Sequence, residues 1–445
     1  MRFLSVLMPV IFAMTAVGLS ARAQQPTGKL WTLDECIVYA ENNNIALKNL
    51  RLRKQVVEQD LVQSKAMMLP DLYAGAGYDL SHYTKTSNQG SKAINTSGSL
   101  GLNSQMTLYN GGVLKNNIRR QNLNLEMAGL DIEVENNNLF LDIIGAYTNI
   151  LLARETILYM ESLLETSKTQ TDQARLQFNA GAISRKQLIQ FESQLANDQF
   201  ALTNAGNASR SNKIVLKQLL QLPAEDSFDI APGTLDVPLR LLPPLNEFLS
   251  DARNTRPEIR NSRLFIQGAE LDIKIAKAGY LPSVSAGAGI STGMRNSINK
   301  GTFTQLGNNF YQNLGITVSF PLFSRKLNET NMARTKIARQ QAELSLVNTN
   351  TLLSQAVEQA YINYQNAMAE YLAAERQFTN YEEVYKISTE ELRLGAANIT
   401  EFVQQRNLYV QALQSFTQSR FRAILAYKIL NFYAGRLNNQ NNSGR

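Results

Sequence analysis

The chain has 445 residues, one histidine, one cysteine and a formal net charge of +7. One histidine excludes histidine-based triads and multi-histidine metal sites, and Lys and Arg residues that do not cluster argue against a nucleic-acid partner. We therefore expect no enzyme, no cofactor and no metal, and the single Cys36 excludes an internal disulfide.

The N-terminus is typical of a signal peptide over residues 1–23. A positive charge at Arg2 precedes an apolar run from 3 to 19, and Ala21-Arg22-Ala23 fits a cleavage site. A retained anchor is the alternative, but Pro9 interrupts a run of only about 17 residues. No later stretch is apolar enough for a spanning helix, so any entry into a membrane would be as a β-barrel.

The rest of the chain contains the same unit twice. Leu69–Gly77 returns as Leu281–Gly289, about 212 residues later, and each copy has a Leu-Pro switch from helix to strand. Upstream of this switch, five residues of the first copy are identical to their counterparts in the second: Asn49, Leu52, Glu58, Asp60 and Ala66 match Asn261, Leu264, Glu270, Asp272 and Ala278. Downstream, equivalent residues of the two copies are about 214 positions apart. We predict a first repeat over 24–222, a linker with a short helix over 223–256, a second repeat over 257–436 and a disordered tail over 437–445.

Helical periodicity predicts very long helices in both repeats. No proline lies between Asp71 and Pro223 or after Pro321, so two helices of about 100 Å can form. Gly181 and Gly395 would end them and permit a tight reversal. The expected helices are Leu33–Asn42, Ile45–Met68, Val113–Asn179 and Ser184–Gln221, then Leu245–Asn254, Glu258–Tyr280, Leu327–Arg393 and Ile399–Arg436. Helices of this length pack as coiled coils, and one shorter pair end to end would match each long helix.

Four segments of alternating polarity predict two β-hairpins, over about 71–109 and 283–322. Each segment has about ten residues, the length of a tilted transmembrane strand, and long polar loops (81–97 and 291–312) join them. Asp71 and Asp79 would face the lumen. A half-buried soluble sheet shows the same alternation and is the alternative. Four strands cannot close a barrel, so two or three copies would have to supply about eight or twelve.

These features together resemble those of a known family. The order and spacing of five segments carry the resemblance: Tyr280-Leu281-Pro282, Met106–Gly112, Phe320-Pro321-Leu322-Phe323, and the turns Phe178–Ala182 and Leu392–Ala396. Over about residues 30–436 the chain resembles the outer-membrane efflux proteins, the TolC-like channel-tunnels.

The resemblance implies an α+β membrane protein that forms a homotrimer. Four transmembrane strands per chain would build one 12-stranded barrel in outer-membrane lipid, and the coiled-coil helices would form a periplasmic tunnel. The channel would be a passive conduit of a tripartite efflux or type I secretion system, with an inner-membrane pump and a periplasmic adaptor as partners. The adaptor-docking turns would be Ala180, Gly181 and Ala182, and Leu394, Gly395 and Ala396.

The resemblance also implies a periplasmic gate beside these turns. Family members commonly carry acidic rings six and nine residues after the second-repeat glycine, which are Glu401 and Gln404 here; in the first repeat the positions are Gln187 and Gln190. Each pair lies on one helix face. Three copies of Glu401 would make a weak cation-attracting ring, from which Gln404 departs. The alternative is that Glu401 is an ordinary solvated residue.

Two other classes of protein remain open from the residues alone. A periplasmic coiled-coil adaptor or structural protein would share the leader and the helices, but not the paired alternating segments. A barrel enzyme or receptor of the outer membrane would need a catalytic cluster or a plug, and the sequence shows neither.

Overall fold

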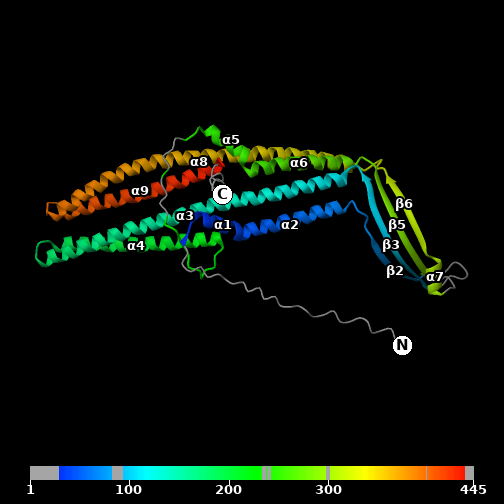
Figure 1. Ribbon diagram of the computed structural model, residues 1–445, viewed down its shortest axis with the longest axis horizontal. Helices are drawn as coiled ribbons and strands as arrows, with labels where there is room; N and C mark the ends of the chain where they lie inside the picture. Colours follow the sequence, from blue (N-terminus) through cyan, green and yellow to red (C-terminus); the bar gives the residue numbers. More distant parts are fainter. Residues whose placement is uncertain are drawn as a thin grey trace, which may run out of the picture.

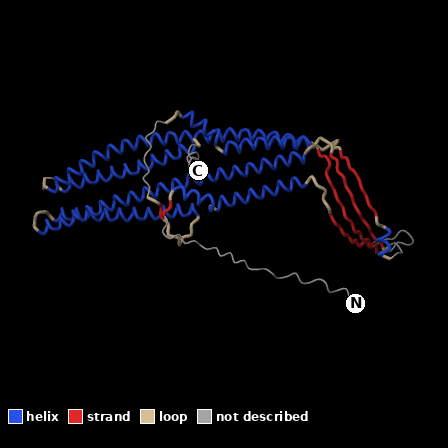
Figure 2. Tube along the Cα trace, viewed as in Figure 1, coloured by secondary structure: helices blue, strands red, loops and turns tan. Residues whose placement is uncertain are grey.

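The computed structural model describes residues 30–82, 94–232, 237, 242–296, 301–396 and 398–435. It is a long helical rod with a β-sheet at one end (Figure 1; Figure 2). The predicted signal peptide and the predicted tail lie outside the described residues, as do parts of the linker and of both loops that join the paired strands.

Helices make up the rod. They are α1 (Leu33–Asn43), α2 (Ile45–Ala66), α3 (Val113–Asn179), α4 (Arg185–Leu220), α5 (Leu245–Thr255), α6 (Pro257–Ala278), α8 (Leu327–Arg393) and α9 (Ile399–Tyr433), whereas the short α7 (Thr302–Asn308) lies at the far end of the sheet (Figure 1). The predicted limits of the two 67-residue helices, α3 and α8, are confirmed. Helix α7 was not predicted and lies in the second polar loop. None of the described helices is both long and apolar enough to cross a membrane.

The two repeats build equivalent halves of the rod. In the first, α2 and α4 lie end to end beside α3, and in the second, α6 and α9 lie end to end beside α8 (Figure 1). This confirms the predicted match of two shorter helices to each long one. Next to the sheet the order across the layer is α2, α3, α6, α8, because α3 packs against α2 and α6, and α6 against α8.

The sheet is antiparallel, with the order β2-β3-β5-β6. Its strands are β2 (Tyr73–His82), β3 (Ile94–Asn110), β5 (Ser283–Arg295) and β6 (Tyr311–Ser319). Strands β3 and β5 extend further into the predicted loops than expected, whereas β6 ends before Pro321, which lacks the N–H that a ladder needs. Leu108 lies at a bulge, because the register with β5 shifts between Thr107 and Tyr109. A short parallel pair, β1 (Leu30–Trp31) with β4 (Asp229–Ile230), was not predicted.

Strand register gives the sheet two unlike faces. Cross-strand partners such as Ala76 and Leu100, or Ala286 and Ile316, lie on the same face, because side chains alternate along each strand. That face carries Ala74, Ala76, Tyr78, Leu100, Leu102, Met106, Ala286, Ala288, Ile290, Leu314 and Ile316. The opposite face carries mainly Gly, Ser, Asn and Thr, and includes Asp79 as predicted. Both edge strands, β2 and β6, are exposed along their whole length.

The core is a series of thin clusters along the rod. At mid-length, α1, β1 and β4 pack on α3 around Cys36, Tyr147 and Ile230, and α5 packs on α8 around Phe248 and Val357. A third cluster lies near the end of the rod distant from the sheet and joins the two repeats. A rod held by such narrow strips depends on contacts between long helices rather than on one central core.

Candidate functional site: the helical tip

Two reversals with the same geometry close the helical end of the rod. Gly181 has a φ of 75° and Gly395 a φ of 74°, the left-handed conformation that glycine adopts without steric cost. In each, the next residue returns to the preceding helix: the Ala182 N–H donates to the Gln177 carbonyl at 2.8 Å, and the Ala396 N–H to the Glu391 carbonyl at 2.8 Å. These are helix-ending bonds of the Schellman type.

The six residues predicted as docking turns are all exposed. Ala180, Gly181 and Ala182 form the first turn, and Leu394, Gly395 and Ala396 the second. Leu394, an apolar side chain, is 67% exposed. Figure 1 shows both turns at the same end of the rod, opposite the sheet. This end of the chain therefore has two small protrusions of the same backbone geometry.

The four predicted gate residues lie in the first two turns of α4 and α9, directly after these reversals. Glu401 and Gln404 are exposed, while Gln187 and Gln190 are partly buried. The Gln187 side chain is engaged locally, because its Oε1 accepts from the Ser184 N–H at 2.7 Å and completes a capping box. Glu401 occupies a helix N-terminus, where a carboxylate is favoured by the dipole, and its N–H donates to Asn398 Oδ1 at 3.3 Å.

A buried polar network behind the tip was missed by the sequence analysis. Arg406 of α9 is 1% exposed. Its Nη2 lies 2.6 Å from Asp198 Oδ2 on α4 and donates to Ser167 Oγ on α3 at 3.0 Å. The Ser167 hydroxyl donates to the same carboxylate, and Gln194 Nε2 donates to Asp198 Oδ1 at 3.0 Å. The network joins the second repeat to the first, and no sequence signal pairs residues so distant.

Aromatic rings join α8 to α9 but have no equivalent between α3 and α4. The rings alternate between the helices at seven-residue spacing: Tyr371, Phe378 and Tyr385 on α8, and Phe402, Tyr409 and Phe416 on α9. Successive centroids are 4.7 to 6.0 Å apart. In the first repeat, 214 positions earlier, the residues are Ile157, Leu164, Thr171, Leu188, Leu195 and Leu202. The second hairpin of the tip is therefore packed differently from the first. Burial, followed by the nearby Glu382 and Tyr385, raises the pKa of the Tyr409 hydroxyl.

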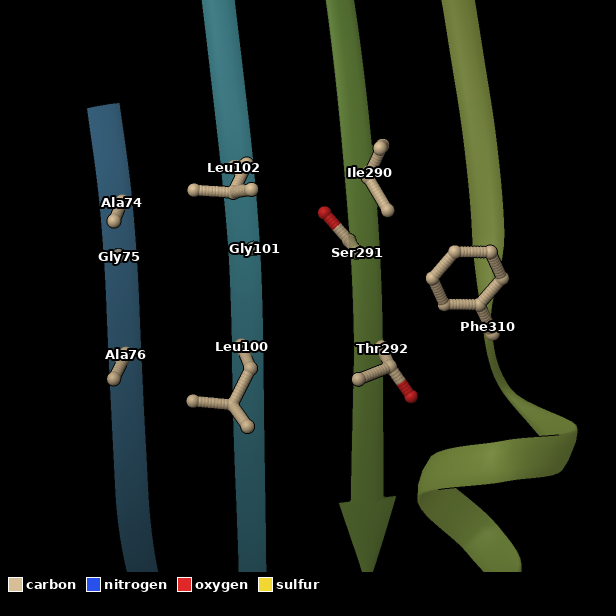
Figure 3. Close-up of a pocket in the computed structure, with 10 residues that line it drawn as sticks. All are labelled: Ala74, Gly75, Ala76, Leu100, Gly101, Leu102, Ile290, Ser291, Thr292 and Phe310. Atoms are coloured by element: carbon tan, nitrogen blue, oxygen red, sulfur yellow. The ribbon is translucent and has the colours of Figure 1, made fainter. Parts of the chain in front are cut away.

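A shallow hollow of about 420 Å³ lies on the sheet at the opposite end of the molecule. Figure 3 shows Ala74, Ala76, Leu100, Leu102 and Ile290 contributed by three neighbouring strands, with Phe310 at the start of β6. No acid, base or thiol lines it. Its lining suits apolar chains rather than a reacting substrate.

The model of the outer membrane efflux protein family matches residues 36–221 and 248–436. The chain belongs to this family. It is 22% identical to the outer membrane protein TolC of Escherichia coli over 464 aligned residues, covering 98% of this chain and 87% of TolC. Its fold is similar to that of the outer membrane channel CmeC of Campylobacter jejuni, with a TM-score of 0.76 and 17% sequence identity, covering 91% of this chain and 85% of CmeC. Its fold is also similar to that of the outer membrane protein VceC of Vibrio cholerae, with a TM-score of 0.76 and 17% sequence identity, covering 91% of this chain and 96% of VceC.

Membership of the outer membrane efflux protein family confirms the predicted location and class. The protein is an outer-membrane efflux channel whose helical rod lies in the periplasm, and the family consists of channel proteins rather than enzymes. The alternatives of a periplasmic adaptor and of a barrel enzyme or receptor are set aside. The gate roles of Glu401, Gln404, Gln187 and Gln190 stay predictions, as do the docking roles of the two turns.

Proposed function

We propose that three copies of the chain close into one 12-stranded barrel with a helical tunnel below it. This homotrimer is a passive conduit. An inner-membrane pump delivers small molecules or proteins through a periplasmic adaptor to the helical tip, and the substrate leaves through the barrel. The pump supplies the energy.

The open edges of the sheet carry the proposal. Among the described strands, none pairs with the outer edge of β2 or of β6. In lipid each unpaired backbone group costs several kcal/mol, so a stable sheet there has no free edge. About eight strands is the smallest barrel in use, and a water-filled lumen needs more. Three four-stranded sheets joined edge to edge satisfy both conditions.

The two faces of the sheet support the same arrangement. The apolar face has the composition that hydrocarbon requires, and the face of Gly, Ser, Asn and Thr suits water. In a closed ring the first contacts lipid and the second lines the lumen. Among the described residues α7 packs against the end of β5, but much of the apolar face is open, as the 84% exposure of Leu314 illustrates.

The tip supports docking and gating in the trimer. Three copies of each Gly-centred turn present six exposed protrusions to an adaptor. Three copies of Glu401 around the axis form a single acidic ring, because Gln404, Gln187 and Gln190 carry no charge. This ring attracts cations only weakly.

Single-channel recording in a planar bilayer tests the conduit. Purified protein is expected to give unitary conductance steps, with a cation preference that Glu401→Gln reduces and the matched Glu383→Gln on α8 leaves unchanged. Protein that inserts without conductance, even when Ala180→Gly and Leu394→Gly loosen both turns, contradicts the conduit. An unchanged cation preference in Glu401→Gln removes the role of that residue only.

A further inference from the structure

The contact between α3 and α6 inside the chain has a counterpart that the chain cannot complete alone. Helix α8 repeats α3, with 67 residues in each, and α2 repeats α6, with 22 in each. Whereas α3 and α6 lie side by side, α2 and α8 lie at opposite edges of the layer next to the sheet (Figure 1). The edge formed by α8 therefore repeats the surface of α3, and the edge formed by α2 repeats the surface of α6. Since α3 and α6 fit each other, the α8 edge of one copy can fit the α2 edge of another.

An ion pair marks the internal contact. Arg120 Nε of α3 lies 3.4 Å from Asp272 Oδ1 of α6. The equivalent positions, 214 and 212 residues away, hold the same two residue types: Arg334 on α8 and Asp60 on α2. Both are exposed, and in the part of the chain that the structure describes neither makes an ion pair.

Apolar residues further along the same two helices repeat in the same way. Leu130 of α3 is 3% exposed and Leu264 of α6 is 9% exposed. Their counterparts on the edges are Leu344, 68% exposed, and Leu52, 57% exposed. The edges thus carry apolar side chains that are buried in the equivalent internal positions, and burying them against another copy would stabilise the contact.

We propose that Arg334 forms an ion pair with Asp60 of the next copy in the ring, repeating the Arg120–Asp272 contact between subunits. The contact is head-to-tail, since each copy offers Arg334 on one edge and Asp60 on the other, and a closed ring satisfies all of them. This inference rests on the proposed trimer and specifies which residues of each copy meet.

The remaining polar contacts between α3 and α6 show how far the equivalence extends. Asn261 Nδ2 donates to Asp131 Oδ1 at 2.6 Å, and the equivalents Asn49 and Ser345 can also form a hydrogen bond. Arg260 lies 4.0 Å from Glu133, but the equivalents Lys48 and Val347 cannot pair. Arg334 with Asp60 is therefore the charged contact that recurs residue for residue.

The two repeats differ at one position beside this ion pair. The Arg120 guanidinium lies over Gly268, where a Cβ would meet its Cζ at 2.8 Å. The equivalent of Gly268 is Val56. Arg334 must therefore pass beside a valine, which the flexible end of a long side chain can do by a small displacement.

Cross-linking tests the contact directly. In a Cys36→Ala background, Arg334→Cys with Asp60→Cys is treated with a short bismaleimide in detergent and run on a denaturing gel. Covalent dimers and trimers are expected from the double variant and not from either single variant. The matched control combines Asp60→Cys with Lys336→Cys, two residues along α8 and on another helix face. Cross-links only in the control, or in neither, overturn the proposed contact.

Native mass measurement of the same samples without cross-linker separates the two proposals. A trimer mass without cross-links refutes the Arg334–Asp60 contact and leaves the assembly intact. A monomer mass refutes the proposed assembly itself.

Charge reversal tests the ion pair as such. Arg334→Asp and Asp60→Arg are each expected to lower the temperature at which the trimer dissociates, and the two together are expected to restore it. Lys336→Asp should give no shift. A double variant no more stable than the single variants overturns the ion pair, even if the helices are neighbours.

Discussion

Arg406 of α9 and Asp198 of α4 form a buried ion pair, with Nη2 and Oδ2 2.6 Å apart. The pair lies 208 residues apart in sequence and joins the return helices of the two repeats behind the tip. Arg406 Nε has no hydrogen-bond partner among the described residues. A buried charge pair of this kind holds its position only while both members are present.

Removing one member of this pair should destabilise the protein strongly. Arg406→Ala leaves Asp198 as a buried carboxylate without its cation, so we expect the free energy of unfolding to fall by about 3–5 kcal/mol. Arg406→Met combined with Asp198→Leu should cost less than either single change, because no charge remains buried. Urea unfolding followed by circular dichroism measures both. Arg393→Ala, which removes an exposed pair with Glu390 at the tip, should leave the midpoint unchanged.

The two tip glycines should resist substitution because of their backbone conformation rather than for lack of space. A Cβ on Gly181 would contact nothing within 4 Å, yet its φ of 75° makes alanine unfavourable by about 1–2 kcal/mol. Gly206, within α4, also has open space around it and no positive φ, so Gly206→Ala should stabilise by up to about 1 kcal/mol. Thermal unfolding of the two variants compares them. Equal shifts of the same sign would show that conformation is not the cause.

Alkaline pH should weaken the core at mid-length of the rod. Burial, and to a lesser degree Glu35, raises the pKa of the Cys36 thiol from 9.0 to about 12. Burial also raises the pKa of the neighbouring Tyr147 hydroxyl from 10.0 to about 12. Both groups keep their protons in the folded state at pH values where the unfolded chain has already lost them.

The sign of the effect follows from this proton difference. The stabilising contribution is complete below about pH 9 and is lost as the pH rises toward about 12. Cys36→Ala should make the decline of unfolding free energy with pH less steep, and Tyr147→Phe should do so at higher pH. Urea unfolding at a series of alkaline pH values measures the slopes. If the unfolding free energy falls equally steeply with pH in the wild type and in both variants, Cys36 and Tyr147 are not the cause of the decline.

The aromatic contacts between α8 and α9 should contribute more than their aliphatic counterparts. Phe416 has ring contacts with Tyr371 at 5.8 Å and Phe378 at 5.0 Å. Phe416→Leu, which introduces the residue found at Leu202, should lower the free energy of unfolding by about 1–2 kcal/mol. Phe303→Leu on α7 is the matched control, because that ring is 89% exposed. No loss at Phe416 would mean that ring stacking adds nothing beyond apolar contact.

Much of the fold could be predicted from the periodicity of apolar residues and from the positions of proline and glycine. The limits of α3 and α8 follow from the absence of proline and from Gly181 and Gly395, which are local signals. The hairpins follow from two-residue alternation, although their ends do not, because pairing across strands decides where a strand stops. Strand β6 is the clearest case, since it ends at Ser319 and the equivalent strand β3 continues to Asn110.

What could not be predicted depends on contacts between distant segments. The Arg406–Asp198 pair has no local pattern, since either residue alone resembles a solvated helix position. The turn into α8 is a second example: Arg325 and Lys326 adopt φ values of 47° and 64°, at the positions where the first repeat has Gly111 and Gly112. Residues other than glycine rarely adopt a positive φ, so Arg325 and Lys326 in the sequence do not indicate a left-handed turn.

The unpaired edges of β2 and β6 have a consequence for biogenesis. Among the described residues, the backbone groups along the outer edges of β2 and β6 have no partner strand, and such an edge is prone to aggregation. In the proposed homotrimer the sheet is completed only when three copies meet, so its assembly should depend on protein concentration.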